Sequence, residues 1–138
     1  MSDEEQERVV NAWLAFAEVD SDTPEYQNTV AYQENVWAYE VLIYDLIIDD
    51  PNNDEAGNQA WNIIQLIAER PMSDKAQALF AAGPVEDLLA YRGEAFIDRV
   101  EEHARVHSAF NHLLGGVWKN AMSDAVWARV QTVRNAVW

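Results

Sequence analysis

The sequence predicts an all-α protein, built as a single compact domain of about six to eight short helices. Apolar residues recur every three or four positions along nearly the whole chain, and no run alternates at a period of two for long enough to form a strand. Proline and glycine divide the chain into short segments, and 49% of the residues are apolar, which is enough for a core. Short helices joined by tight turns favour antiparallel pairs, stacked as in a short α-solenoid.

Capping and breaking residues place the helices along the chain. Ser2 with Glu5 forms a capping box, Thr23 followed by a proline is typical of a helix start, and Gly93 is typical of a helix end. The pair Gly83-Pro84 is expected to break one helix and begin the next. The segment 24–48 can be one helix or two with a joint near Gln33. The expected helices cover residues 3–19, 24–48, 54–69, 74–82, 84–92, 94–107, 108–114 and 124–137.

The charge of the chain is concentrated in its first half. Residues 1–69 hold sixteen acidic residues and one base, whereas residues 70–138 hold eight of each. The predicted domain, residues 1–138, therefore has an acidic N-terminal half and a charge-balanced C-terminal half. A field of one sign on part of a surface attracts a partner of the opposite sign, so we expect a basic protein partner. No basic patch is available for direct binding to nucleic acid.

The composition also bears on the cellular setting. The chain has no cysteine, which excludes disulfides and thiolate metal sites and suits a reducing cytoplasm. Residues 1–5 are acidic, unlike the basic start of a signal peptide. The most apolar run, Val41–Ile48, is far too short to span a bilayer. We therefore predict a soluble cytoplasmic protein without membrane contact, and the sequence leaves its oligomeric state open.

Three segments of the C-terminal half carry a resemblance. They are Ala81-Ala82-Gly83-Pro84-Val85-Glu86-Asp87-Leu88-Leu89 with the following Gly93–Glu101, then Gly116-Val117-Trp118, then Val126-Trp127-Ala128-Arg129-Val130. The chain resembles a group of short bacterial proteins that is catalogued only as a domain of unknown function, over roughly residues 34–135. The sequence departs from the pattern at residues 106–110, where a proline is expected before Phe110. The resemblance implies an all-α fold and a bacterial or phage source, and it brings no activity.

Tyrosines and carboxylates alternate in the acidic half, which is typical of a protein-binding surface, because rings bury area at low entropic cost and carboxylates pair with arginine. An ordinary solvated helix face is the alternative interpretation. Like charges one turn apart disfavour a helix, and this cost mildly favours binding. Trp37 and Trp138 are the tryptophans expected to be exposed, whereas Trp13, Trp61 and Trp127 are expected in the core. The candidate partner-binding residues are Glu34, Trp37, Tyr39, Glu40, Tyr44, Asp45, Asp49 and Asp50.

Other chemistry is weakly signalled. His103 and His107 lie one turn apart and His112 follows, but the Glu of a metalloprotease motif is missing, so surface histidines near a helix end are the preferred interpretation. Arginines and acids alternating over residues 86–105 indicate a salt-bridged helix surface. The sequence has no phosphate-binding glycine loop and no catalytic triad. We therefore predict no catalytic residues, no metal site and no cofactor, and a protein that is not an enzyme.

The favoured function is neutralisation of a basic protein, as by an immunity protein that inhibits a bacterial toxin. A phage-encoded inhibitor that mimics nucleic acid and blocks a host defence nuclease is a second hypothesis. A metal-dependent hydrolase that uses the acidic cluster, and a structural subunit of a larger assembly, are further alternatives.

Overall fold

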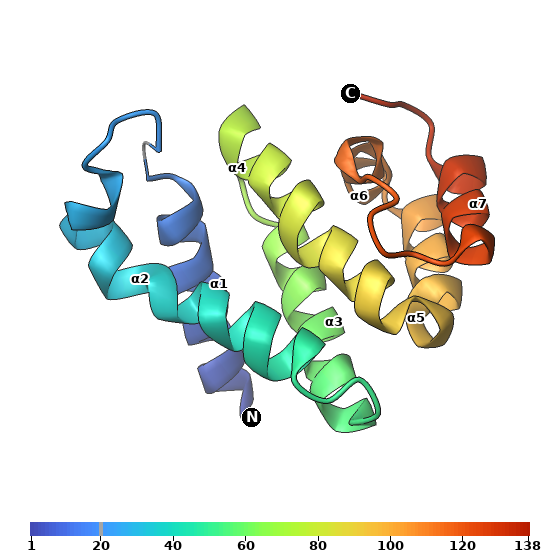
Figure 1. Ribbon diagram of the computed structural model, residues 1–138, viewed down its shortest axis with the longest axis horizontal. Helices are drawn as coiled ribbons and strands as arrows, with labels where there is room; N and C mark the ends of the chain where they lie inside the picture. Colours follow the sequence, from blue (N-terminus) through green and yellow to red (C-terminus); the bar gives the residue numbers. More distant parts are fainter. Residues whose placement is uncertain (20) are drawn as a thin grey trace. The chain divides into compact units, whose positions relative to one another are not determined.

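The computed structural model describes residues 1–19 and 21–138, and over these residues the chain is all-α with no strand, as the sequence predicted (Figure 1). None of the helices in this part of the chain is both long and apolar enough to cross a membrane. The chain divides into two compact units, residues 1–76 (unit 1) and 77–138 (unit 2). The division falls close to the charge boundary at residue 69. That residues 1–138 form one domain stays a prediction.

Unit 1 begins with α1 (Asp3–Ala17), where the Ser2 hydroxyl accepts a hydrogen bond from the Glu5 N–H at 3.1 Å, as expected of the N-cap. After a single 3-10 turn, η1 (Tyr26–Asn28), the second helix α2 (Val30–Glu40) begins. The expected start at Thr23 is wrong. Thr29 is the N-cap instead, because its hydroxyl accepts from the Tyr32 N–H at 3.2 Å.

The helix α2 continues without a break into η2 (Val41–Ile48), so residues 30–48 form one helical run and no joint occurs at Gln33. In η2 the hydrogen bonds span five residues, as in a π-helix, and the last of them joins the Asp49 N–H to the Tyr44 carbonyl at 2.8 Å. The wider turn keeps pairs of residues four and five positions apart on one face. That buried face consists of Leu42, Ile43, Leu46 and Ile47.

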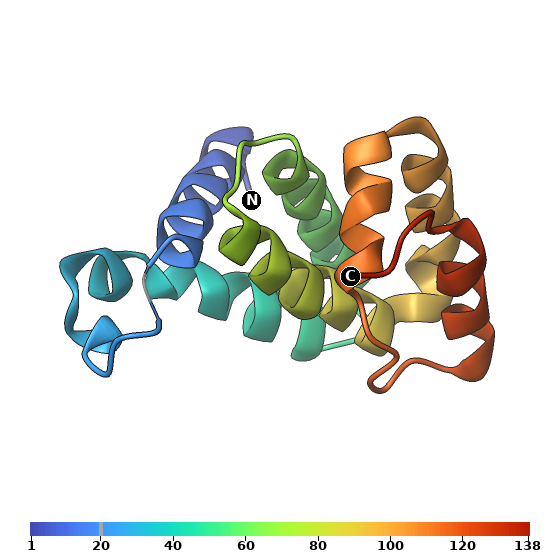
Figure 2. The ribbon, with the colours of Figure 1, turned by 90° about the horizontal axis from the view of Figure 1, so that it is seen from above.

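The third helix, α3 (Asp54–Ala68), is capped by Asn53, whose side chain accepts from the Ala56 N–H at 3.1 Å. It packs against α1 and η2, and α1 packs against α2, which gives unit 1 its core (Figure 2). Trp13 and Trp61 are buried in this core, as predicted.

A long helical stretch follows in the chain. It comprises α4 (Asp74–Phe80), η3 (Ala81–Val85) and α5 (Glu86–Val106). Gly83-Pro84 does not break it, contrary to expectation. Proline lacks an N–H and its ring clashes with the carbonyl four residues earlier, and the π turn of η3 relieves that clash, with the Glu86 N–H reaching back to Ala81.

Gly93 does not end a helix either, because α5 continues through it with a kink at Arg92 (φ −132°, ψ 22°). The residue serves close packing instead. A Cβ at Gly93 would lie 3.1 Å from both methyl groups of Val126 on α7 (Asp124–Val133). Such approach of two helices is a common use of glycine.

The remaining elements of unit 2 are α6 (Ser108–Leu113) and the 3-10 turn η4 (Leu114–Gly116). Helix α7 ends at Val133, four residues before the expected end. The Asn111 side chain explains this end, since it donates to the Val133 carbonyl at 2.9 Å and accepts from the Asn135 N–H at 2.8 Å. The chain then runs back to η4, where the Trp138 N–H donates to the Gly115 carbonyl at 2.9 Å.

Gly83 and Gly93 give a matched test of this packing. Apart from its chain neighbours, nothing lies within 4 Å of a Cβ built at Gly83. Gly83→Ala should therefore change the free energy of unfolding by less than about 1 kcal/mol, because the reduced backbone entropy of the unfolded chain is offset by crowding of the new methyl against the Pro84 ring. Gly93→Ala should lower it, because the added methyl presses on Val126. Urea unfolding of both variants measures the difference, and equal shifts would contradict the packing of α5 on α7.

Candidate protein-binding surface

The outward side of the run from Val30 to Ile48 presents aromatic and acidic side chains together. Its exposed residues recur every three or four positions and therefore share one side of the helix. Five of the eight candidate residues from the sequence lie on it. We call this surface the α2 face, and it consists of Val30, Glu34, Trp37, Glu40, Tyr44 and Asp45.

Two large rings stand open to solvent on the α2 face. The side chains of Trp37 and Tyr44 are 40% and 53% exposed, and Val30 adds an exposed apolar side chain at the start of the helix. Tryptophan and tyrosine are enriched in protein interfaces, where they bury much area and keep a polar group available. The exposure expected of Trp37 is thus found.

Tyr39 has a different place from the other candidate residues. It is half-buried, and its ring centroid lies 5.5 Å from that of Phe16 on α1 and 6.0 Å from that of Tyr44. Phe16 in turn packs edge-on against the fully buried Trp13 at 6.5 Å. A continuous row of rings therefore leads from the core to the α2 face, and Tyr39 supports Tyr44 rather than standing free.

The carboxylates of this region are all exposed. Glu34, Glu40 and Asp45 flank the rings, while Asp49 and Asp50 follow at the end of η2. Asp50 accepts from the Asn52 N–H at 3.1 Å and so shapes the turn after η2. Acids near the C-terminal end of a helix face the negative end of its dipole, which costs stability. Asp45 and Asp49 therefore disfavour the fold locally.

The basic residues of unit 1 do little to offset this charge. Unit 1 has seventeen acidic and three basic residues, a formal charge of −14, whereas unit 2 has seven and six, a formal charge of −1. Arg70 pairs with Glu7 and donates to Asn11 at 3.1 Å, and the Lys75 ammonium donates to the Val19 carbonyl at 2.7 Å. Both contacts lie away from the α2 face in sequence, on α1 and the residues that follow it.

The three histidines are placed in unit 2 by structural contacts. His103 and His107 lie at the end of α5 as expected, with ring centroids 4.2 Å apart, and His103 also packs on Phe110 at 4.9 Å. The ring of His112 stacks on Trp138 at 5.5 Å. Within residues 1–19 and 21–138, no three His, Cys, Asp or Glu side chains are grouped so that they could hold a metal ion.

The tryptophans of unit 2 only partly follow the predictions. Trp138 is exposed as expected, although its indole N–H donates to the His112 carbonyl at 2.7 Å. Trp127, expected in the core, is half-buried with the Arg134 guanidinium 4.9 Å from its ring. Trp118 is the most exposed tryptophan, at 71%, and the sequence reasoning missed it. Its place in a Gly-rich, non-helical segment is the feature of the sequence that could have indicated its exposure.

Asp87 of unit 2 is a weaker acid than usual. Burial, and secondarily the charge of Glu86, raises the pKa of Asp87 to about 6 from its ordinary value of 3.8. Glu86 itself is buried and holds the loop before α7, because it accepts from the Trp118 N–H at 2.8 Å and from the Asn120 amide at 3.3 Å. Raised carboxyl pKa values occur at catalytic sites, but the contacts of the neighbouring Glu86 are structural.

The comparisons with known proteins agree with the resemblance. The sequence matches a family of unknown function, DUF6869, over residues 25–137. The chain belongs to this family. No curated protein and no solved structure matches the chain. The DUF6869 match includes the whole α2 face, and family membership by itself assigns no activity to it.

The different places of Tyr39 and Tyr44 lead to different costs of truncation. Tyr39→Ala should lower the free energy of unfolding by about 2–4 kcal/mol, because it removes a packed ring next to Phe16. Tyr44→Ala should lower it by about 1 kcal/mol or less, because that ring is half in solvent. Urea unfolding measures both values. A larger cost at Tyr44 than at Tyr39 would show that the α2 face is not free.

Asp87 should make stability depend on pH. Its folded pKa lies above the unfolded value, so the folded state binds more protons in between, and the free energy of unfolding rises as the pH falls from about 7 to 5. Asp87→Asn should remove this component and stabilise the protein at pH 7 by about 1 kcal/mol, allowing for the solvent around a half-buried group. Urea unfolding across this range, with the exposed Glu102→Gln as control, tests it. If the free energy of unfolding depends on pH equally in the unmutated protein and in Asp87→Asn, Asp87 is not the group responsible.

Proposed function

We propose that the protein is a binding module that neutralises a basic protein through the α2 face. One observation carries the proposal: exposed rings and exposed carboxylates share one side of a helix within a unit whose formal charge is −14. Such a surface would speed encounter with a cationic partner by long-range attraction and then bury its aromatic side chains.

The arrangement of the rings supports this mode of binding. Trp37 and Tyr44 supply the apolar contact area, and Tyr39 holds Tyr44 through the row of rings from the core. A ring that is already positioned loses little freedom when a partner covers it, which favours affinity. Glu34, Glu40 and Asp45 would form charge-assisted hydrogen bonds with arginine side chains at the rim.

In its finer form the proposal is a bacterial cytoplasmic immunity protein, which covers the substrate site of a cationic toxin. A toxin that acts on nucleic acid needs a basic surface to hold phosphates, and an acidic surface with aromatic residues complements it. The π-helical geometry at Tyr44 and Asp45 adds support, since such segments are frequent at functional sites.

The test uses two triple variants with the same change of net charge. Glu34→Gln with Glu40→Gln and Asp45→Asn alters the α2 face, whereas Glu4→Gln with Glu25→Gln and Glu55→Gln alters exposed acids elsewhere in unit 1. The first should weaken binding to the basic protein encoded by the neighbouring gene by about a hundredfold, at roughly 1 kcal/mol for each interfacial charge contact. The second should change mainly the association rate. Calorimetry and stopped-flow kinetics measure the two effects.

Salt dependence separates the mechanisms. Association should slow steeply between about 50 and 500 mM salt, because screening shortens the reach of the field. Trp37→Ala should raise the dissociation rate without changing this slope. Binding that is indifferent to salt, or equal losses in the two triple variants, would contradict docking through the α2 face. A nucleic-acid mimic would compete with DNA for the nuclease that it inhibits. Inhibition of a nuclease that DNA does not relieve would therefore count against a nucleic-acid mimic.

A further inference from the structure

A closely fitted side-chain site lies in unit 2, at the pair Gly115-Gly116 of η4, and Trp138 fills it. The indole ring stacks on the His112 ring, with centroids 5.5 Å apart and 19° between the planes. The indole N–H donates to the His112 carbonyl at 2.7 Å, and the backbone N–H of Trp138 donates to the Gly115 carbonyl at 2.9 Å. We call Gly115, Gly116 and His112 the diglycine site. It binds both the ring and the backbone of one tryptophan.

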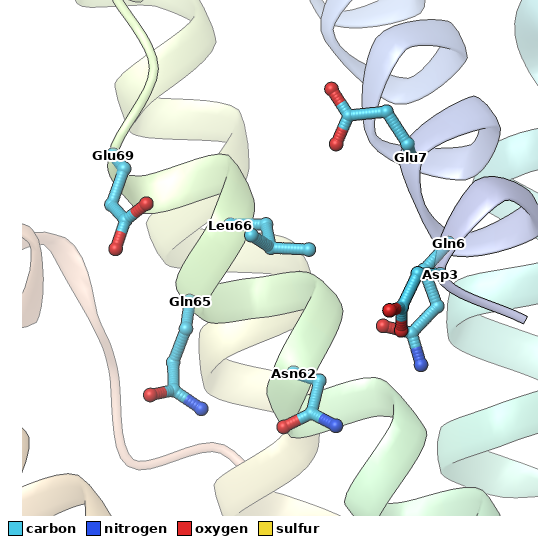
Figure 3. A pocket seen from close by; sticks show the side chains of 7 residues that line it. All are labelled: Asp3, Gln6, Glu7, Asn62, Gln65, Leu66 and Glu69. Atoms are coloured by element: carbon cyan, nitrogen blue, oxygen red, sulfur yellow. The ribbon is translucent and has the colours of Figure 1, made fainter.

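The diglycine site differs in kind from the hollow between α1 and α3 of unit 1. Figure 3 shows polar side chains, among them Glu7 and Gln65, around that hollow. Their variety singles out no class of molecule. The diglycine site has its occupant in place, so the class of its ligand follows from the contacts that are made.

The ring of Trp138 explains the two glycines, whereas the backbone does not. Neither Gly115 nor Gly116 has a positive φ, so other residues could adopt the same backbone there. A Cβ at Gly115 would lie 2.6 Å from Cδ1 of Trp138, and a Cβ at Gly116 would lie 2.6 Å from Cη2 of the same ring. The latter would also lie 3.0 Å from the Cβ of Ala81 on η3. The site is therefore shaped for a flat ring.

The occupant is held by few contacts. Residues 134–138, which we call the strap, are not helical. Val137 is 71% exposed and Trp138 itself is 43% exposed, whereas the ring of Trp13 in the core of unit 1 is fully covered. Segments with few buried contacts open locally at a low cost in free energy. The strap can leave the site while α7 stays in place, because Asn111 holds the end of that helix.

We propose that the diglycine site receives a tryptophan from an extended segment of another protein, and that Trp138 occupies it as an internal competitor. The site offers two backbone acceptors and a stacking ring, which a tryptophan supplied by another chain can use equally well. A second copy of this chain is the poorer source, because each copy has a formal charge of −15 and like charges repel. The site lies in unit 2 and does not depend on the α2 face.

The probe is the capped peptide acetyl-Asn-Ala-Val-Trp-amide, which repeats residues 135–138. Trp138→Ala, which lacks the internal occupant, should bind the peptide at least about tenfold more tightly than the unmutated protein. In the unmutated protein the tethered Trp138 competes at an effective concentration of millimolar order. Isothermal titration calorimetry measures both affinities. A peptide whose indole nitrogen is methylated should bind Trp138→Ala about tenfold more weakly, because it cannot donate to the His112 carbonyl.

Trp118→Ala is the matched control, since it removes a more exposed indole of the same unit and leaves Trp138 in place. It should bind the peptide as weakly as the unmutated protein does. Adding Gly116→Ala to Trp138→Ala should weaken binding at least about tenfold, because the new methyl lies where the edge of the ring must pass. Acetyl-Asn-Ala-Val-Leu-amide should likewise bind Trp138→Ala at least about tenfold more weakly than the tryptophan peptide.

A measurement on the unmutated sequence decides the matter if Trp138→Ala does not fold. Protein labelled with 5-fluorotryptophan gives a fluorine resonance for Trp138, which is assigned by its absence from Trp138→Phe. Millimolar peptide should move this resonance to the position of 5-fluorotryptophan in solvent. An unchanged resonance would overturn the proposal, as would equal binding of the tryptophan and leucine peptides by Trp138→Ala. A dimer in sedimentation velocity that disappears in Trp138→Ala would also overturn it, because a second copy would then be the source of the tryptophan.

Discussion

Burial of one apolar face of the run from Val30 to Ile48 determines what unit 1 exposes. Leu42, Ile43, Leu46 and Ile47 lie on the side of η2 that is buried, and η2 packs on α3, because exposing them would cost about 1.5–3 kcal/mol for each side chain. In the wider turn of η2 these four residues stay on one side. Trp37 and Tyr44 are then directed to solvent together with the carboxylates. The α2 face is thus a consequence of how the opposite side is buried.

The position of each acid relative to its helix separates two groups of carboxylates in unit 1. Asp3, Glu4 and Glu5 lie in the first turn of α1, where a negative charge interacts favourably with the helix dipole, and the first turn of α3 is similarly acidic. Helix formation accounts for these residues. Asp45 and Asp49 lie near the opposite pole of η2 and oppose it. In the proposed function, binding of a partner offsets this cost.

Local signals predicted the elements, while contacts between distant residues decided their ends. The cap at Ser2 could be predicted, because a serine hydroxyl at a helix start accepts a hydrogen bond from the N–H three residues ahead, and Ser73 and Ser123 show the same geometry. Gly93 was wrongly predicted to end a helix. Its role in packing depends on Val126, which is distant in sequence. The candidate residues of the α2 face follow helical spacing and could be listed, but the support of Tyr39 by Phe16 could not.

Unit 2 shows how the chain uses charged residues when they serve the fold. Arg129 on α7 donates to Glu101 on α5 at 3.0 Å and also pairs with Asp98, and hydrogen bonding from Arg129 holds the pKa of Glu101 below its ordinary value. Glu94 accepts from the Ser123 hydroxyl at 2.9 Å, and Glu86 fixes the loop around Trp118. These carboxylates are matched by donors of their own unit.

Glu34, Glu40 and Asp45 have no such role in unit 1, because their side chains bond to none of the residues that the structure describes. An acidic composition kept only for solubility would not need a group of unmatched acids gathered beside exposed rings on one helix face. This grouping of acids and rings supports the proposed docking of a cationic protein on the α2 face.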